Sequence, residues 1–243
     1  MPVVDLQTPA DQEEFWLFGY GSLIWKPPPH FDRRVPGWVT GYVRRFWQDH
    51  RGTPEAPGRV VTLIERPHWE KLADHHATAP EKVWGTAYRI LAEKVVEVKE
   101  YLDIREINGY TIHYTPFYPA DGSPPLRALV YIGTPQNDQF TGPQPVQTLA
   151  EHIYRSQGPS GLNQEYLLSL EHSLDELGPE SGDGHVTDLA NRVRVLIQHG
   201  RKKRVADSDA DLQSLPTAET AVAHHEFKEA NSISEQEETE KAH

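Results

Sequence analysis

The chain has 243 residues, and its 24 Lys and Arg against 36 Asp and Glu give a formal net charge of −12. It contains no cysteine, which excludes a disulfide framework, a thiolate nucleophile and any zinc or iron–sulfur site built on cysteine. No apolar stretch reaches the ~20 residues of a membrane-spanning helix. Residues 1–14 lack the basic and then apolar pattern of a signal peptide. We therefore expect a cytoplasmic protein without a membrane partner.

The negative charge is concentrated at the end of the chain, because 205–243 holds ten acids and two lysines. This segment has too few apolar residues to offset the entropy cost of ordering it. We expect an acidic disordered tail at 205–243, one domain at 14–204 and a flexible extension at 1–13. The basic run 201–204 is either a nucleic-acid or localisation patch, or a solvated helix end, and the second is favoured. An acidic body without a basic face argues against a nucleic-acid partner.

Residues 14–133 have the alternation and the turn residues of a strand-rich region. Glycine or proline separates nearly all of its apolar and aromatic runs, which are 15–18, 38–47, 60–64, 83–90, 110–118 and 126–132. One helix is expected among them, because Leu91, Val95, Val98 and Leu102 recur at helical spacing before the stop signal Asn108-Gly109.

The last third of the chain changes to a helical pattern. Apolar stripes occur at 146–153, at 167–177 before Gly178, and at 189–197 before Gly200. Strands followed by helices, with one helix between strands, indicate an α+β fold built on a small mixed β-barrel with flanking helices.

The most unusual local sequence is 15–25, in which an apolar strand leads directly into Gly19, Tyr20, Gly21 and Ser22. Two glycines allow a sharp turn that exposes consecutive backbone N–H groups, and such groups can hold a carboxylate or a phosphate. The loop is neither a dinucleotide fingerprint nor a nucleophile elbow, because Ile24 stands where each motif requires glycine. Taken alone, it is either an anion cradle or a tight strand connection without a ligand.

A second candidate site is 101–110, where Asp103, Arg105 and Glu106 follow the last apolar residue of the expected helix. The carboxyl end of a helix disfavours a further negative charge, which would raise the pKa of an acid placed there. A partly buried carboxylate with a raised pKa suits a general base near neutral pH. A surface charge cluster, in which Arg105 offsets its neighbours, is the simpler interpretation of this segment alone.

Two further groups of polar residues complete the candidates. Segment 49–59 carries Arg51 and Arg59, either of which could pair with a substrate carboxylate or cap a surface turn. The 13 histidines include the adjacent pairs at 75–76 and 224–225, but no pair has the spacing of a zinc helix. We therefore expect no bound metal.

Seven sequence blocks carry a family resemblance: Phe18-Gly-Tyr-Gly-Ser-Leu-Ile-Trp-Lys-Pro27, Arg44-Arg-Phe-Trp-Gln48, Asp49-His-Arg-Gly-Thr-Pro54, Pro57-Gly-Arg-Val-Val-Thr-Leu63, Val83-Trp-Gly-Thr-Ala-Tyr-Arg89, Tyr101-Leu-Asp-Ile-Arg-Glu106 and Gly158-Pro-Ser-Gly161. In this order and at nearly this spacing, they resemble the ChaC-type glutathione-specific γ-glutamylcyclotransferases. The resemblance implies a γ-glutamylcyclotransferase-like α+β fold. It also implies that reduced glutathione is cleaved in the cytosol to 5-oxoproline and cysteinylglycine, without a cofactor or a metal.

The resemblance also implies roles for individual positions. The catalytic acid of the family's Arg-Glu pair falls on Glu106, which would take the proton of the substrate's α-amine as that amine attacks the γ-carbonyl. The family's Tyr-Gly-Ser-Leu loop falls on 20–23. The implied substrate-binding residues are Leu17, Phe18, Gly19, Tyr20, Gly21, Ser22, Leu23, Arg51 and Tyr166.

The chain departs from the family pattern where Gln48 runs directly into Asp49, because members usually have a few small polar residues between the two. Segment 67–80 is longer than the family minimum, and we interpret it as a surface insertion. Three alternatives to the implied activity remain open. The chain could be a non-catalytic module that senses γ-glutamyl compounds, a cyclotransferase for other γ-glutamyl amines, or an interaction protein that works through its acidic tail.

Overall fold

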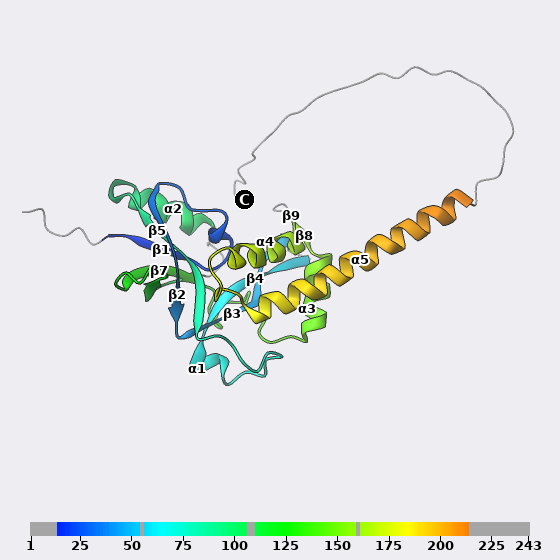
Figure 1. Ribbon diagram of the computed structural model, residues 1–243, viewed down its shortest axis with the longest axis horizontal. Helices are drawn as coiled ribbons and strands as arrows, with labels where there is room; N and C mark the ends of the chain where they lie inside the picture. The colour runs from blue at the N-terminus through cyan, green and yellow to red at the C-terminus, as the bar shows by residue number, and fades with distance from the viewer. Residues whose placement is uncertain (1–13, 54–55, 106–109, 159–160, 214–243) are drawn as a thin grey trace, which may run out of the picture. The chain divides into compact units, whose positions relative to one another are not determined.

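The computed structural model describes residues 14–53, 56–105, 110–158 and 161–213 (Figure 1). At 50–53, 56, 103–105 and 203–213 it describes the backbone alone. The chain divides into two units, 1–202 and 203–243. No helix within the described ranges is long and apolar enough to cross a membrane.

Five strands close a barrel in the order β1-β5-β2-β6-β7. Its neighbouring strands are antiparallel except for β1 and β7, which are parallel. The strands are β1 (Trp16–Gly19), β2 (Phe31–Thr40), β5 (Lys82–Ile90), β6 (Thr111–Pro119) and β7 (Leu126–Ile132). The barrel confirms the predicted α+β class.

Two glycines on neighbouring strands make room for the aromatic core between them. Gly37 and Gly85 are directly paired between β2 and β5. A Cβ at Gly37 would lie 2.5 Å from Cζ of Phe117, and one at Gly85 would lie 2.7 Å from Cε2 of Phe18. The two phenyl rings pack with their centroids 5.5 Å apart. Any larger residue at either glycine would displace these rings.

The outer face of β1, β5 and β7 is covered by α2 (Val95–Arg105), which follows the short 3₁₀ helix η2 (Ala92–Lys94). Val98 and Leu102 of α2 are fully buried in one cluster with Leu17, Tyr88 and Leu129 of the strands. This contact confirms the helix predicted from the apolar spacing. Its predicted stop at 108–109 lies outside the described residues.

The rest of the first unit packs around a hairpin of β3 (Tyr42–Thr53) and β4 (Ala56–Glu65) (Figure 1). Helices α3 (Val146–Arg155) and α4 (Asn163–Asp175) pack on β4. Helix α5 (Gly184–Gln213) adds four apolar residues near its start to the same core, namely Val186, Leu189, Ala190 and Val193. The short elements are η1 (Ser22–Ile24), α1 (Arg66–Trp69), β8 (Gln157–Gly158) and β9 (Gly161–Leu162).

Three expectations from the sequence need correction. The run 38–47 is not one strand, because Gly41, with φ of +83°, turns the chain between β2 and β3. The last helix does not end at Gly200 but continues to Gln213, since good helix formers on both sides outweigh the ~1 kcal/mol cost of an interior glycine. Segment 67–80 is more than a surface insertion, because Trp69 is buried and Asp74 accepts a 2.5 Å hydrogen bond from the buried Arg45.

Candidate functional site

The predicted loop follows the end of β1 and runs into η1, and its glycines are required by close packing. A Cβ at Gly19 would lie 2.5 Å from Cβ of Leu23. A Cβ at Gly21 would lie 3.0 Å from Oη of Tyr166 and 3.1 Å from Cγ2 of Val61. The loop therefore turns back on itself and is pressed against α4 and β4, as close approach of the backbone requires.

The hydrogen bonds of the loop leave a set of donors available. The carbonyl of Gly21 accepts from the N–H of Ile24 at 3.0 Å, and the carbonyl of Ser22 accepts from that of Lys26 at 2.8 Å. Among the described residues, none accepts a hydrogen bond from the N–H of Gly21, Ser22 or Leu23. Three consecutive donors of this kind can hold a carboxylate or a developing oxyanion.

Tyr20 anchors the loop to the barrel. Its side chain is buried, and its hydroxyl donates a 2.8 Å hydrogen bond to the carbonyl of Tyr131 on β7. The neighbouring Leu17 and Phe18 are also buried, on opposite sides of β1. These three side chains therefore support the loop. The part of this region available to a ligand is the backbone that follows β1.

Tyr166 is brought to the loop by the first turn of α4. Its ring makes edge contacts with Trp25, at 5.4 Å between centroids, and with Phe46, at 5.9 Å. Its hydroxyl lies next to Gly21, as the glycine packing shows. The structure therefore joins two of the sequence candidates, the loop and Tyr166.

Asn163 fixes the start of α4, and the sequence analysis gave it no role. Its Oδ1 accepts from the N–H of Arg59 and its Nδ2 donates to the carbonyl of Arg59, both at 2.8 Å. The side chain is 2% exposed. This two-point clamp ties β4 to α4 one helical turn before Tyr166.

We expect Asn163→Ala to lower the free energy of unfolding by about 2 to 4 kcal/mol, because it leaves two buried backbone groups of Arg59 without partners. Chemical denaturation would measure the change. Gln198→Ala, at an exposed position of α5, is the matched control and should change stability by less than about 0.5 kcal/mol. Equal stabilities for the two variants would contradict the clamp.

A buried cation lies beside the loop, and sequence reasoning missed it as well. Arg44 is 1% exposed, its Nη2 donates to the carbonyl of Trp84, and its Nη1 lies 3.7 Å from Oδ2 of Asp183. Burial lowers the pKa of Arg44, while the charge of Asp183 and the hydroxyls of Tyr166 and Tyr20 raise it. A guanidinium keeps its proton even so, and its positive charge favours an anion at the neighbouring loop.

The hairpin that carries Arg51 stays paired at the point where the chain departs from the family pattern, with a register shift on each side of that point. Gln48 pairs with Val60 and Asp49 with Arg59, and the pairing continues to Arg51 opposite Gly58. Asp49 is ion-paired with Arg59, and burial raises the pKa of the Asp49 carboxyl although Arg59 opposes the shift. The shortened point therefore lies inside a paired strand. The side chain of Arg51 is outside the described residues.

Glu106 also lies outside the described residues, directly after the end of α2 at Arg105. The described part of α2 approaches the loop's anchor: Leu102 belongs to the same buried cluster as Leu17 and Tyr131. Tyr131 is the residue whose carbonyl holds Tyr20. The helix that leads to Glu106 and the strand that leads to the loop therefore share one packed face.

A cavity lies elsewhere on the molecule. It has a volume of about 610 Å³, and its lining includes Phe15, Arg89, Val95 and Lys99 but no residue of the loop. Its acids are already paired, because Arg89 binds Asp32 through two hydrogen bonds and Glu14 through a third. This cavity therefore does not mark the loop.

Comparisons with known proteins agree on one family. Residues 15–196 match the model described as ChaC-like protein. The glutathione-specific gamma-glutamylcyclotransferase of Schizosaccharomyces pombe is 44% identical over 203 residues, which is 81% of this chain and 100% of the relative. The human glutathione-specific gamma-glutamylcyclotransferase 1 is 41% identical, over 77% of this chain and 82% of the relative.

A solved structure gives the same result. The crystal structure of a gamma-glutamylcyclotransferase from yeast, described as specific to glutathione, superposes with a TM-score of 0.68 at 36% identity. The match covers 75% of this chain and 96% of the yeast chain. The barrel and its helices are therefore shared over nearly the whole of that protein.

Proposed function

Because the chain belongs to the ChaC-like protein family, we propose that it is a glutathione-specific γ-glutamylcyclotransferase, a carbon–nitrogen lyase. Its substrate is reduced glutathione, and its products are 5-oxo-L-proline and L-cysteinylglycine. The observation that carries the proposal is the loop, whose three available N–H donors lie beside the hydroxyl of Tyr166 and the buried charge of Arg44. The similarity to the named relatives covers 81% and 77% of this chain.

The reaction is an internal exchange of two carbon–nitrogen bonds. The α-amine of the γ-glutamyl group attacks its own γ-carbonyl carbon, and a five-membered ring closes. The bond from that carbon to the cysteinyl nitrogen then breaks. Of the three protons of the α-ammonium group, one stays as the ring N–H and two end on the departing amine, which leaves as an ammonium group; no water is consumed. Because both reacting groups belong to one molecule, the protein contributes mainly by holding the substrate folded.

The N–H groups of Gly21, Ser22 and Leu23 are proposed to bind the negatively charged part of the folded substrate, either its α-carboxylate or the oxyanion formed at the γ-carbonyl. Gly19 and Tyr20 complete this binding segment. Leu17 and Phe18 act through the position of β1, since both side chains are buried in the core. Tyr166, next to Gly21, is proposed to contact the substrate through its hydroxyl.

Glu106 is proposed as the base that takes the proton from the α-ammonium group and returns it to the leaving amine. The support is its position: it directly follows α2, which packs on the strand face that anchors Tyr20. Arg51 is proposed to pair with a carboxylate of glutathione. The pairing of β3 with β4 continues to Arg51, opposite Gly58, and this supports the role over the non-catalytic alternative.

The remaining parts of the proposal concern surroundings and organisation. The reaction is placed in the cytoplasm, where thiols are kept reduced, and it uses no cofactor, metal, nucleic acid or membrane. The catalytic domain is placed at 14–204, between a flexible extension at 1–13 and the acidic tail from 205. Helix α5 extends into that segment, to Gln213.

The specificity is tested by comparing glutathione with γ-glutamyl-alanine at equal concentration and measuring 5-oxoproline. A site that also binds the cysteinylglycine part should give a kcat/KM for glutathione at least ~10²-fold higher, because lost contacts to that part remove transition-state binding. Equal values would favour the alternative of a general γ-glutamyl amine cyclotransferase. Binding of glutathione without any product would favour the sensor.

A further inference from the structure

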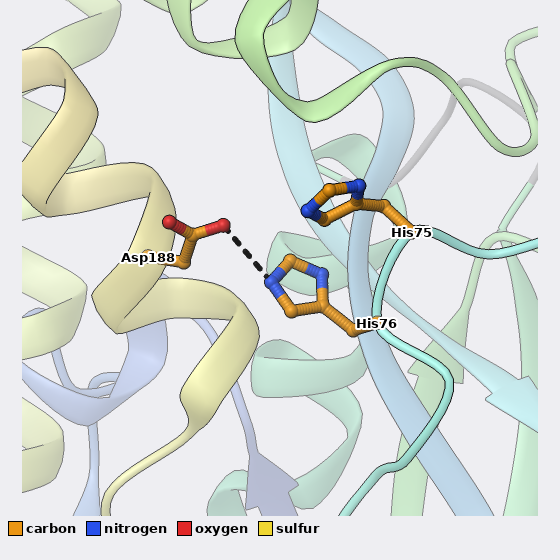
Figure 2. Close-up of side chains that lie close together, drawn as sticks. All are labelled: His75, His76 and Asp188. Atoms are coloured by element: carbon orange, nitrogen blue, oxygen red, sulfur yellow. Dashed lines mark hydrogen bonds and ion pairs between the residues drawn. The ribbon is translucent and has the colours of Figure 1, made fainter.

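A chain of hydrogen bonds runs from the surface to the candidate site through two histidines. The backbone N–H of Phe46 donates to Nε2 of His185 at 3.1 Å. Nδ1 of His185 lies 3.2 Å from Nδ1 of His76, and Nε2 of His76 lies 3.1 Å from Oδ2 of Asp188. Figure 2 shows the last of these contacts, with Asp188 on α5 and the ring of His76 facing it.

The backbone N–H of Phe46 determines which ring nitrogen carries the proton in both histidines of this hydrogen-bond network. Since a backbone N–H can only donate, Nε2 of His185 must accept, and the proton of the neutral ring is on Nδ1. That proton then points at Nδ1 of His76, which must accept in turn. The proton of neutral His76 is therefore on Nε2, and it is donated to Asp188.

His185 is held in its neutral form. Its ring is 4% exposed, and burial lowers its pKa well below the usual range of histidine, an effect that Arg45, His76 and His75 reinforce when charged. The other charged groups at this position are Asp74, which binds Arg45, and Asp183, which accepts from the N–H of His185. Asp188 is shared with Arg192 through a 2.9 Å hydrogen bond.

Phe46 connects the two histidines to the candidate site formed by the loop and Tyr166. It lies in a bulge of β3, because two residues, 46 and 47, stand opposite one residue of β4 between the pairs Arg45–Thr62 and Gln48–Val60. Its ring is fully buried between His185, at 6.1 Å, and Tyr166, at 5.9 Å. The position of Tyr166 against the loop therefore depends on Phe46, and that of Phe46 on His185.

We propose that His76 and His185 are positioning residues: while His76 is neutral, the pair holds Phe46, and through it Tyr166, against the loop. A proton added to His76 would have to go to Nδ1, where it would meet the N–H of His185. His185 cannot reverse its own donor and acceptor, because its Nε2 is occupied by the N–H of Phe46. The His76–His185 bond is then lost. The effect on catalysis rests on the proposed function. The proton order, meaning a proton on Nδ1 of His185 and on Nε2 of His76, does not.

The same proton order argues against a metal ion at this place. Possible ligand atoms of His75, His76 and Asp188 lie within 4.8 Å of one another. A metal on Nε2 of His76 would move the ring's proton to Nδ1 and create the same conflict with His185. We therefore assign these residues to hydrogen bonding and not to metal binding.

The proposal is tested by comparing His76→Asn with His75→Asn. The amide oxygen of asparagine can replace Nδ1 as an acceptor but does not titrate. Between pH 7.5 and pH 5.5, we expect kcat/KM of the His75→Asn control to fall about tenfold more than that of His76→Asn. The control keeps His76 and therefore loses the His76–His185 hydrogen bond, and a factor of about ten is the cost of one such bond. The pH dependence of the reaction step itself is common to both variants and cancels in the ratio. Identical pH profiles would overturn the positioning role.

A second measurement on the unmodified chain does not depend on turnover. Nitrogen-15 NMR of the histidine rings should show a protonated Nδ1 on His185 and a protonated Nε2 on His76 at pH 7.5, with no change on addition of EDTA or of equimolar zinc. A protonated Nε2 on His185, or a shift of the His76 signals with zinc, would overturn the proton order. Absence of glutathione turnover at every pH, with these tautomers intact, would refute the proposed function and leave the hydrogen-bond chain standing.

Discussion

Replacing Glu106 by Gln should lower kcat for glutathione by about 10²- to 10⁴-fold, the contribution of a well-placed general base. The amide keeps the size of the side chain but cannot take the proton from the α-ammonium group. Binding of glutathione should be retained, since the loop amides and Tyr166 are unchanged. Steady-state kinetics and calorimetric titration would measure the two effects separately.

The matched control for this variant is Glu100→Gln. Glu100 is an exposed residue of α2, and the change in charge and shape is the same. Its kcat should stay within twofold of the unmodified chain, consistent with the small effect of surface substitutions. A Glu106→Gln enzyme with near-normal turnover would remove Glu106 from the mechanism.

Gly19→Ala should lower kcat/KM by about 10²-fold, because a displacement of ~1 Å at a positioning element can cost this much. The added Cβ would lie 2.5 Å from Cβ of Leu23, so the loop has to move away from its present path. The three N–H donors would then be displaced from the positions in which they are proposed to bind the substrate. Kinetics with glutathione, together with thermal unfolding to verify the fold, would measure the effect.

Gly182→Ala is the control for the loop variant, because a Cβ at Gly182 meets nothing within 4 Å. It should leave both activity and stability near those of the unmodified chain. If Gly19→Ala were as active as Gly182→Ala, the path of the loop would not matter for the reaction. The proposal that its backbone binds the substrate would then be wrong.

Local pattern was sufficient to predict most of the elements. The apolar runs located the strands because burial on a closed barrel requires them, and the spacing from Leu91 to Leu102 predicted α2 because one helical face packs on Leu17 and Tyr88. The turn at Gly41 was missed because apolar residues continue on both sides of it. The strand order of the barrel was beyond any local pattern, since β1 pairs with β5 and β7.

The candidate site was only partly visible in the sequence. The glycines of the loop indicated an anion cradle because their spacing exposes N–H groups, a purely local property. The clamp of Asn163 on Arg59 joins residues 104 positions apart, and the His185–His76 contact joins residues 109 apart. Such pairs arise from tertiary packing, so a single sequence without its fold does not identify them.

The central claim is that the substrate's own amine, and not water, attacks the γ-carbonyl. The most direct test is to incubate the purified full chain with reduced glutathione in water enriched in oxygen-18 and to follow the products by mass spectrometry. We expect one cysteinylglycine for each 5-oxoproline, and no oxygen-18 in the 5-oxoproline. Glutamate carrying one oxygen-18 atom would show hydrolysis by water and would contradict the account, as would bound glutathione that is never converted.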